Sequence, residues 1–534
     1  MARTIRLRRW QKAALEAFDD RKDIDFLAVA TPGAGKTRFA LTAARMSLGN
    51  RRPTCLIVVA PTQALKRQWA DAAEAFDLHL LDNWSATDAS LPSDSHGLVT
   101  TYQQVATSAR SLRALAADAF VIFDEIHHAG DDRAWGESVR LAFETSKERL
   151  SLSGTPFRSD TQPIPFVTYR GDEADPDFTY SYGDALRDRG VVRPVRFPRV
   201  DGQMEWIATD GSFTSAGFSD FLDRERSRQR LRTALALDGE WLPEVLRQAH
   251  RSLRDVRETH PNAGGLVIAT DQTHARGIAG LMRRHCGVEP VLATSDDPTA
   301  NAQIARFAGS ADPWIIAVRM VSEGVDIPRL RVGVFATTTL TELFFRQAVG
   351  RFVRHTRGLG PQRAYVYIPN DPVLCQHASS IDEERRHSLR RRDDVDATEL
   401  EERVQTEEQL SLFSAISAVA SGPALLEREV TDLDDELDPR DEEDDEEGLL
   451  VELLPLAGAP TDPVERFLSP REQRAQLRER NAACASEIAR ITRQDHRSVN
   501  AELNRRAGIR SIAEASISQL EKRLDAADLW LIRG

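Results

Sequence analysis

The chain has 534 residues and a formal net charge of −13, and 41% of its residues are hydrophobic. This length exceeds what one hydrophobic core usually organises, so it predicts two or three domains. No run approaches the roughly 18 apolar residues that span a bilayer, and the amino terminus lacks the apolar core of a signal peptide, so we expect a soluble cytoplasmic protein without a membrane partner. The four cysteines lie far apart without a CxxC pair, which argues against a disulfide framework and a thiolate-bound metal.

The negative charge is concentrated in one segment. Residues 427–447 hold 14 acidic and 2 basic side chains, which gives 2 − 14 = −12. A like-charge run of this kind is typical of a disordered linker. The remainder is close to neutral, so the composition neither supports nor excludes a nucleic-acid partner.

In chain order, apolar and β-branched runs alternate with longer helical patterns, which is typical of βαβ units and a parallel sheet. The strands expected in the first half are residues 25–30, 55–60, 97–101, 120–124 and 150–154. After a less regular stretch, a second series is expected at residues 265–270, 314–319, 332–336 and 364–369. The pattern therefore predicts an α/β fold with two parallel-sheet domains in tandem.

The alternation stops near residue 373, where a polar segment begins that leads to the acidic run. Residues 470–534 return to helical periodicity, with Ser511 and Glu514 spaced as a capping box ahead of Ile517. The expected divisions are a first domain, a connector, a second domain, a charged linker and a helical C-terminal module, at residues 1–160, 161–262, 263–372, 373–460 and 461–534.

The strongest local motif is TPGAGKT, which follows the first expected strand and precedes a helical pattern. It consists of Thr31, Pro32, Gly33, Ala34, Gly35, Lys36 and Thr37. A glycine-rich turn at a helix amino terminus lets backbone N–H groups surround phosphate oxygens, while the lysine reaches the β and γ phosphates and the threonine hydroxyl binds Mg²⁺. The full eight-residue pattern has glycine where this chain has Ala30, but an incidental GKT in a surface loop would not explain the flanking strand and helix.

The second motif is VIFDEIHH, an apolar strand that ends in Asp124 and Glu125. A carboxylate at this position can hold Mg²⁺ through its water shell, and the next one can orient and deprotonate an attacking water. Acidic pairs at strand ends are common, so the prediction of a hydrolase site depends on the phosphate-binding motif that precedes this one.

The ordered set TPGAGKT, APTQALKRQW, TTYQQV, DEIHH, SGTPFR, MVSEGVDIP and QAVGRFVR resembles the DExH helicases of superfamily 2. The resemblance covers about residues 1 to 370. SGTP and the segment YSYGDALRDRGVVRP are similar to the XPB-like proteins and the motor subunits of restriction enzymes. The resemblance implies two tandem RecA-like domains, ATP and Mg²⁺ as ligands, and ATP hydrolysis coupled to movement on nucleic acid.

The resemblance also assigns roles outside the first motif. Arg351 and Arg354, three apart in QAVGRFVR and expected on one helix face, would stabilise the γ-phosphate, with Gln347 beside the nucleotide or its attacking water. Gly324 and Asp326 of SEGVDIP would link the ATP state to the grip on the strand. Gln11 matches the position that reads adenine, which implies a preference for ATP over GTP. The second domain itself runs from GLVIAT into Asp271 and Gln272 without a GKT.

Polar residues at strand ends are the candidate nucleic-acid contacts. Open α/β sheets bind ligands at the carboxyl ends of strands, and hydroxyl or amide groups there can hold phosphates without reading bases. The candidates are Pro61, Thr62, Thr100, Thr101 and Thr270. Threonine at a strand end can equally be a helix cap.

DNA is favoured over RNA because the motifs resemble the repair and restriction branch, but an RNA helicase and a duplex translocase remain open. A different class also remains open, an ATPase switch that senses nucleic acid while its C-terminal region recruits a protein partner.

Overall fold

The computed structural model describes residues 3–49, 53–87, 90–130, 133–155, 163–171, 173–188, 190–208, 211–294, 297, 299–318, 327–356, 358–389, 414–420, 449–453 and 470–533. Contacts divide the chain into two units. Unit 1 comprises Met1–Val29, Gly35–Thr179 and Glu447–Gly534, and unit 2 comprises Ala30–Ala34 and Tyr180–Glu446. No helix among the described residues is long and apolar enough to cross a membrane.

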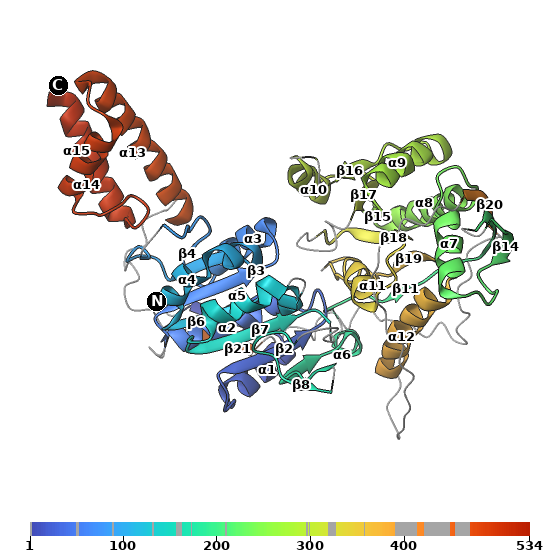
Figure 1. Cartoon of the computed structure of the whole chain (residues 1–534). Helices are drawn as coiled ribbons and strands as arrows, with labels where there is room; N and C mark the ends of the chain where they lie inside the picture. Colours follow the sequence, from blue (N-terminus) through green and yellow to red (C-terminus); the bar gives the residue numbers. More distant parts are fainter. Residues whose placement is uncertain are drawn as a thin grey trace. The chain divides into compact units, whose positions relative to one another are not determined.

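A seven-stranded sheet forms the centre of unit 1 (Figure 1). In spatial order its strands are β10 (Phe178–Tyr180), β2 (Asp25–Ala30), β7 (Glu148–Ser153), β6 (Ala119–Phe123), β3 (Cys55–Ala60), β5 (Gly97–Thr101) and β4 (Leu80–Leu81). The strands from β2 to β4 pair in parallel. Their residues are buried almost without interruption, which is the pattern of a sheet covered on both faces.

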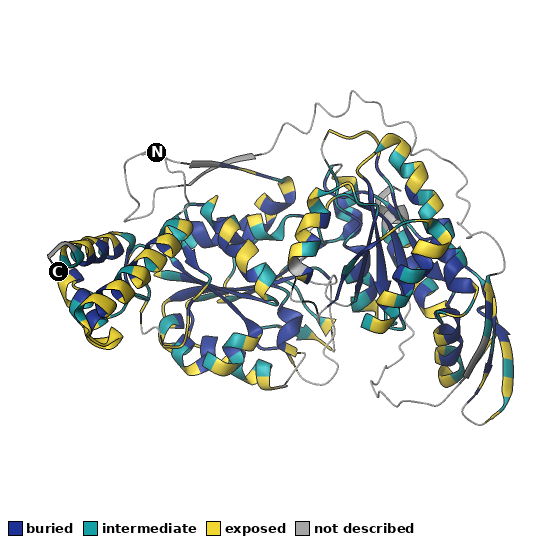
Figure 2. Cartoon of the chain, turned by 90° about the horizontal axis from the view of Figure 1, so that it is seen from above, coloured by how far each residue is buried: buried dark blue, intermediate teal, exposed yellow. Residues whose placement is uncertain are grey.

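Helices between the strands supply this cover. They are α1 (Arg9–Asp19), α2 (Lys36–Gly49), α3 (Gln63–Glu74), α4 (Tyr102–Ala116) and α5 (Arg133–Phe143), with the 3₁₀ turn η1 (Ile126–Gly130). Figure 2 shows the strands as buried while the helices expose their outer faces. A two-stranded sheet pairs β8 (Tyr169–Arg170) with β9 (Glu173–Ala174), and another pairs β1 (Arg3–Leu7) with β21 (Leu449–Leu453).

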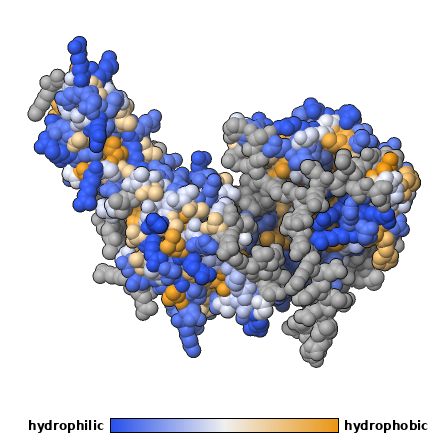
Figure 3. Space-filling model, viewed as in Figure 1, coloured by the Kyte–Doolittle hydropathy of each residue, from blue (hydrophilic) through white to orange (hydrophobic). Residues whose placement is uncertain are grey.

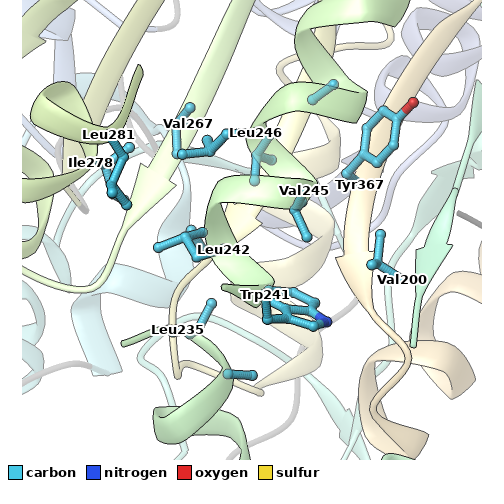
Figure 4. Packing of buried hydrophobic residues seen from close by; sticks show 14 of the residues in the cluster. Val200, Leu235, Trp241, Leu242, Val245, Leu246, Val267, Ile278, Leu281 and Tyr367 are labelled. Carbon is cyan, nitrogen blue, oxygen red and sulfur yellow. The ribbon is translucent and has the colours of Figure 1, made fainter. Parts of the chain in front are cut away.

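Unit 2 contains a second parallel sheet of seven strands. The strands are β11 (Val195–Arg196), β19 (Ala364–Pro369), β18 (Leu330–Ala336), β15 (Gly264–Ala269), β17 (Trp314–Val318) and β16 (Val291–Ala293), with β12 (Arg199–Val200) beside β19. Its helices are α6 (Tyr182–Arg187), α8 (Trp241–Thr259), α9 (Gln272–Cys286), α10 (Ala300–Gly309), α11 (Glu342–Val349) and α12 (Pro372–Leu389). Figure 4 shows side chains of α8 packed between Val267 of β15 and Tyr367 of β19.

An antiparallel sheet of three strands also belongs to unit 2. It orders β14 (Phe213–Gly217), β13 (Gly202–Ile207) and β20 (Ser414–Ala420), and α7 (Arg224–Ala234) packs against it. Burial alternates along β13, with Met204 and Trp206 fully buried, so one face of this sheet is in the core.

Three helices form the C-terminal module of unit 1: α13 (Pro470–Thr492), α14 (His496–Ala507) and α15 (Ile517–Arg533). Arg523 is fully buried among them and donates hydrogen bonds to the amide oxygens of Asn481, Asn500 and Asn504. This network joins all three helices.

Ion pairs join the module to α3 and to the loops after β4 and before β5. Arg471 pairs with Asp71 at 2.6 Å and with Asp82 at 3.4 Å. The buried Arg474 pairs with Asp94 at 2.7 Å, and the other oxygen of Asp94 accepts the Ile517 N–H at 3.0 Å.

The fold class expected from the sequence is confirmed, and each of the nine expected strands is present within two residues of its expected bounds. The expected capping box is wrong, because α15 begins at Ile517 and the reciprocal pair is Ser516 and Gln519. Glu514 donates its N–H to Ser511 in the preceding turn instead. The acidic run lies outside the described residues.

Candidate active site

Register brings the motifs of unit 1 to one edge of its sheet. Val29 of β2 lies opposite Ser153 of β7, and Val59 of β3 lies opposite Phe123 of β6. Ala60 lies opposite Thr101 of β5. Because parallel strands end at a common edge, the residues that follow them are neighbours, and this edge is where such sheets bind ligands.

The phosphate-binding turn occupies the 31–35 segment between β2 and α2. Gly33 and Gly35 have φ of +83° and +98°, conformations that glycine adopts without strain. The Ala34 N–H donates to the Thr31 carbonyl at 3.1 Å, which closes the turn. Since α2 begins at Lys36, its first N–H groups have no intrahelical acceptor and can bind an anion.

Gln11 braces this turn. Its Nε2 donates to the Gly35 carbonyl at 3.0 Å, and its Oε1 accepts the Arg8 N–H at 2.9 Å. A Cβ atom at Gly35 would lie 2.9 Å from Gln11 Nε2, so a side chain there would displace the Gln11 amide. Both ends of the Gln11 amide therefore contact the protein backbone, a role that the motif alone did not predict.

Lys36 and Glu125 form the centre of the site. Lys36 Nζ lies 2.7 Å from Glu125 Oε1, and both side chains are largely buried. Glu125 Oε2 accepts the Gly154 N–H at 2.8 Å, and His127 Nδ1 lies 3.6 Å away. Glu125 has φ of +47°, a left-handed conformation that is uncommon for a side chain larger than glycine and aims its carboxylate at Lys36.

Asp124 is held differently although it is adjacent. Its Oδ2 accepts the Trp69 Nε1–H at 2.8 Å, and its carbonyl accepts the Tyr102 hydroxyl at 3.0 Å. Burial, and then the charge of Glu125, raises the pKa of Asp124 to about 6. Burial acts in the same direction on Glu125, but the Lys36 ammonium overcomes it and holds the pKa of Glu125 below its ordinary value.

These residues fit Mg²⁺ bound together with phosphates. The Thr37 hydroxyl lies in the first turn of α2, and Asp124 supplies a buried carboxylate that Trp69 orients. No group of three or more His, Cys, Asp or Glu side chains is gathered into a metal site within the described chain. Mg²⁺ commonly takes one or two protein ligands and completes its shell with phosphate and water.

The candidate nucleic-acid residues of unit 1 lie at the ends of β3 and β5, and two of them cap helices. Thr62 accepts the Leu65 N–H at the start of α3, and Thr101 accepts the Gln104 N–H at the start of α4. Thr100 donates to Gln104 Oε1 at 3.1 Å, and Pro61 precedes the Thr62 cap. Thr270 of unit 2 donates to the Ala336 carbonyl.

Sequence reasoning missed the residues that connect these caps. Lys66 Nζ and Thr100 Oγ1 both donate to Gln104 Oε1, at 3.1 Å each, and Gln104 Nε2 donates to the Trp84 carbonyl at 2.8 Å. Lys66 and Gln104 belong to APTQALKRQW and TTYQQV, so the motifs contained them without indicating their partnership.

The remaining predicted residues belong to unit 2. Gln347 lies on α11, which ends at Val349 with Gly350 as its C-cap. Arg351 and Arg354 do not share a helix face as expected, because Arg351 lies in the turn that follows and Arg354 forms an antiparallel bridge with Val192. Asp271 caps α9 by accepting the His274 N–H. Gly324 and Asp326 lie outside the described residues.

The chain is similar in sequence to known proteins. Residues 4–158 match the family described as type III restriction enzyme, res subunit. An uncharacterized protein of Mycobacterium tuberculosis strain H37Rv is 45% identical over 392 residues, which cover 72% of this chain and 65% of the relative. An uncharacterized protein of Mycobacterium leprae is 45% identical over 390 residues, with the same coverage. The chain thus matches about two thirds of the length of these relatives.

Among solved structures, a fragment of a presumed HsdR subunit of a type I restriction enzyme from Vibrio vulnificus YJ016 is 18% identical, with a TM-score of 0.48. The match covers 70% of this chain and 65% of that one. Over residues 4–158 the chain is thus similar to this restriction-enzyme family, and the order of its motifs resembles that of the DExH helicase-like group of superfamily 2, which includes restriction-enzyme motor subunits.

Proposed function

We propose that this chain hydrolyses ATP and uses the free energy to translocate along or remodel nucleic acid, with DNA favoured over RNA. The observation that carries the proposal is the arrangement of Lys36, Glu125 and the Gly154 N–H. An ammonium that can bind phosphate and a carboxylate that can orient water, both beside the turn between β2 and α2, support the proposal.

The proposed chemistry is attack of water on the terminal phosphorus. Glu125 orients the water and accepts its proton, the bond from the γ-phosphorus to the bridging oxygen breaks, and ADP and phosphate result. Lys36 and the N–H groups at the start of α2 bind the phosphate oxygens. Thr37 and Asp124 would hold Mg²⁺, which neutralises phosphate charge when bound.

The ion pair of Lys36 with Glu125 suggests a control on the timing of this chemistry. While Lys36 holds Glu125, the carboxylate is a weak base because its pKa is lowered. Phosphate oxygens compete for the same ammonium, so nucleotide binding would release Glu125 and raise its basicity. The base would then gain strength only when the substrate is present.

Further roles follow from the resemblance. Arg351 and Arg354 would stabilise charge on the transferred phosphoryl group with Gln347 near the attacking water, and Gly324 and Asp326 would transmit the nucleotide state. Gln11 would favour adenine over guanine, through the turn that it braces.

Backbone phosphates are the proposed targets of the capping residues. A threonine hydroxyl that accepts an N–H to cap a helix still has its own proton to donate. Thr62 is half-buried, whereas Thr100 and Thr101 are almost fully buried. Thr62 is therefore the stronger candidate in unit 1, with Pro61 preceding it. Thr270 in unit 2 would exchange its bond to the Ala336 carbonyl for one to a phosphate.

Steady-state ATPase measurements test this function. The wild-type chain would be compared with Lys36→Ala and Glu125→Gln, each without polymer and with single-stranded DNA, duplex DNA or RNA. We expect stimulation by at least one polymer, with loss of turnover in Lys36→Ala and a fall of about 10²- to 10⁴-fold in Glu125→Gln. Intact turnover in Glu125→Gln would remove that residue as the base.

A second candidate function is an ATP-dependent switch that senses nucleic acid and recruits a protein through its C-terminal region. It is supported by the ion pairs that join the C-terminal module to the rest of unit 1, since a module fixed in this position could present a partner surface. The switch would be favoured over the motor if nucleic acid stimulated the ATPase activity and the chain neither separated strands nor displaced a bound triplex strand.

A further inference from the structure

The loop between β14 and α7 presents Phe221 entirely to solvent. Its relative exposure is 104%, the highest among the described large hydrophobic side chains, and that of the next, Phe213, is 61%. Burial of a side chain of this size is ordinarily worth about 1.5–3 kcal/mol, so exposing it is costly unless it has a partner.

This loop is held firmly in place. The Arg230 side chain is almost completely buried beneath it, and Nη1 donates to the carbonyls of Gly217, Phe218 and Asp220 at 2.7, 3.2 and 3.0 Å. The Arg230 guanidinium also lies 3.7 Å from the buried Asp371. Loss of these partners would leave the buried guanidinium charge unpaired, which is strongly destabilising. The loop therefore holds the backbone at Phe221 in a fixed position.

The helix that follows carries a row of arginines. Arg224, Arg228 and Arg232 are exposed and spaced four residues apart on α7. Residues at this spacing are neighbours on a helix surface, and the row extends over about 12 Å at 1.5 Å per residue. The opposite face is buried through Arg230 and Thr233. Figure 3 shows strongly hydrophilic side chains gathered over α7.

We propose that Phe221 and the arginine row Arg224, Arg228 and Arg232 bind a single-stranded segment of nucleic acid. Phe221 stacks on an unpaired base, and the row contacts successive backbone phosphates. An aromatic platform beside a basic track is the combination by which proteins bind single strands without reading sequence. This inference rests on the proposed function, because it supplies a further contact for the same polymer outside the motif residues.

The surroundings favour a single strand over other occupants. A protein partner with an apolar surface would require an apolar neighbourhood, but Phe221 is flanked by Asp220 and by Asp223, the cap of α7. A duplex offers phosphates to the arginines, but a projecting ring can contact a base face there only after a base step has been unstacked, which is unfavourable. An unpaired strand offers an open base face to the aromatic side chain and phosphates to the arginine row.

Fluorescence anisotropy with a labelled oligothymidylate, measured on the full chain over a series of salt concentrations, tests the proposal. Phe221→Ala should weaken binding by about five-fold or more, and Phe221→Trp should restore it. The triple change of Arg224, Arg228 and Arg232 to Gln should make the slope of log K against log salt shallower by about 2, because each lost phosphate contact contributes about 0.7 for a single strand.

Two matched controls separate this surface from general effects. Phe213→Ala removes an exposed phenylalanine of β14, the strand that precedes the Phe221 loop. Arg306→Gln removes an exposed arginine of α10. Both should bind with wild-type affinity, and the melting temperature of every variant should be that of the wild type.

The possible outcomes are distinct. If wild type binds the strand and Phe221→Ala binds equally well, this inference fails while the proposed function stands. If wild type neither binds any polymer nor shows stimulated ATPase activity, both fail. If Phe221→Ala weakens duplex binding as strongly as single-strand binding, the assignment to an unpaired strand is overturned.

Discussion

Trp69 determines how Asp124 can meet a cation, because its indole N–H holds one carboxylate oxygen and leaves the other available. Groups that orient a metal ligand without touching the metal commonly contribute 10- to 100-fold to metal affinity. Trp69→Phe removes the donor and keeps most of the packing. We expect the Mg²⁺ concentration for half-maximal ATPase activity to rise by about ten-fold or more in this variant.

The matched control is Trp135→Phe, since Trp135 stacks on Tyr102, whose hydroxyl donates to the Asp124 carbonyl and not to its carboxylate. Its Mg²⁺ requirement should remain that of the wild type. An unchanged requirement in Trp69→Phe would show that the indole N–H only assists packing.

His96 makes the stability of unit 1 depend on pH. Burial, and then the charges of His79 and Arg45, lower the pKa of His96 to about 4, while an unfolded histidine has a pKa of about 6.5. Below pH 6.5 the unfolded chain therefore binds more protons, so stability that is full above that pH is lost as the pH falls towards 4. At pH 5 the loss should be about 1–2 kcal/mol.

His96→Asn should reduce this loss of stability, because an amide takes up no proton in this pH range. The amide oxygen can still accept the His79 N–H that His96 Nδ1 accepts at 3.0 Å. The measurement is the change in melting temperature between pH 8 and pH 5, which should be smaller in the variant by about 2–4 °C per kcal/mol. Parallel losses in the two proteins would assign the acid sensitivity to other groups.

At the scale of elements, the strands with continuous apolar runs were predictable because both faces of a parallel sheet are buried. The sheet of β14, β13 and β20 was not, since β13 and β14 lie in the less regular stretch of the sequence and β20 is contributed from more than 200 residues beyond β13. Local periodicity contains no signal for such a distant pairing. The same limit applies to the site. The motifs predicted Lys36 and Glu125, but not that the Gly154 N–H, which follows a different strand, orients the Glu125 carboxylate.

The contact between α13 and the loop before β5 should couple the stability of the C-terminal module to that of the rest of unit 1. Arg474 is 5% exposed and pairs with Asp94, whereas Arg471 is 30% exposed. In a double-mutant cycle, Arg474→Met and Asp94→Asn should give a coupling energy of about 1–3 kcal/mol. The comparison of Arg471→Met with Asp71→Asn should give less than about 1 kcal/mol, because exposed ion pairs are weak.

Hydrogen exchange provides a local measurement of the same contact. The Ile517 N–H donates to Asp94, so its exchange should accelerate in Asp94→Ala. Unchanged protection at Ile517 would indicate that the module keeps its position without this pair.

At the scale of the molecule, the segment after α12 contributes to both units. β20 completes the antiparallel sheet of unit 2, and β21 pairs with β1 in unit 1. Shortening the chain should therefore have effects that depend on which of these strands is lost, although both follow the second parallel sheet in sequence.

A chain that ends at Leu389 lacks β20 and leaves the edge of β13 without its partner, next to the buried Met204 and Trp206. A chain that ends at Leu453 keeps both strands and loses only the helical module. We expect the shorter chain to melt at a lower temperature and to associate through its open strand edge, while the longer one remains monodisperse. Thermal melting and size-exclusion chromatography distinguish the two chains. Equal melting temperatures and monodisperse elution of both chains would mean that β20 adds little to the stability of unit 2.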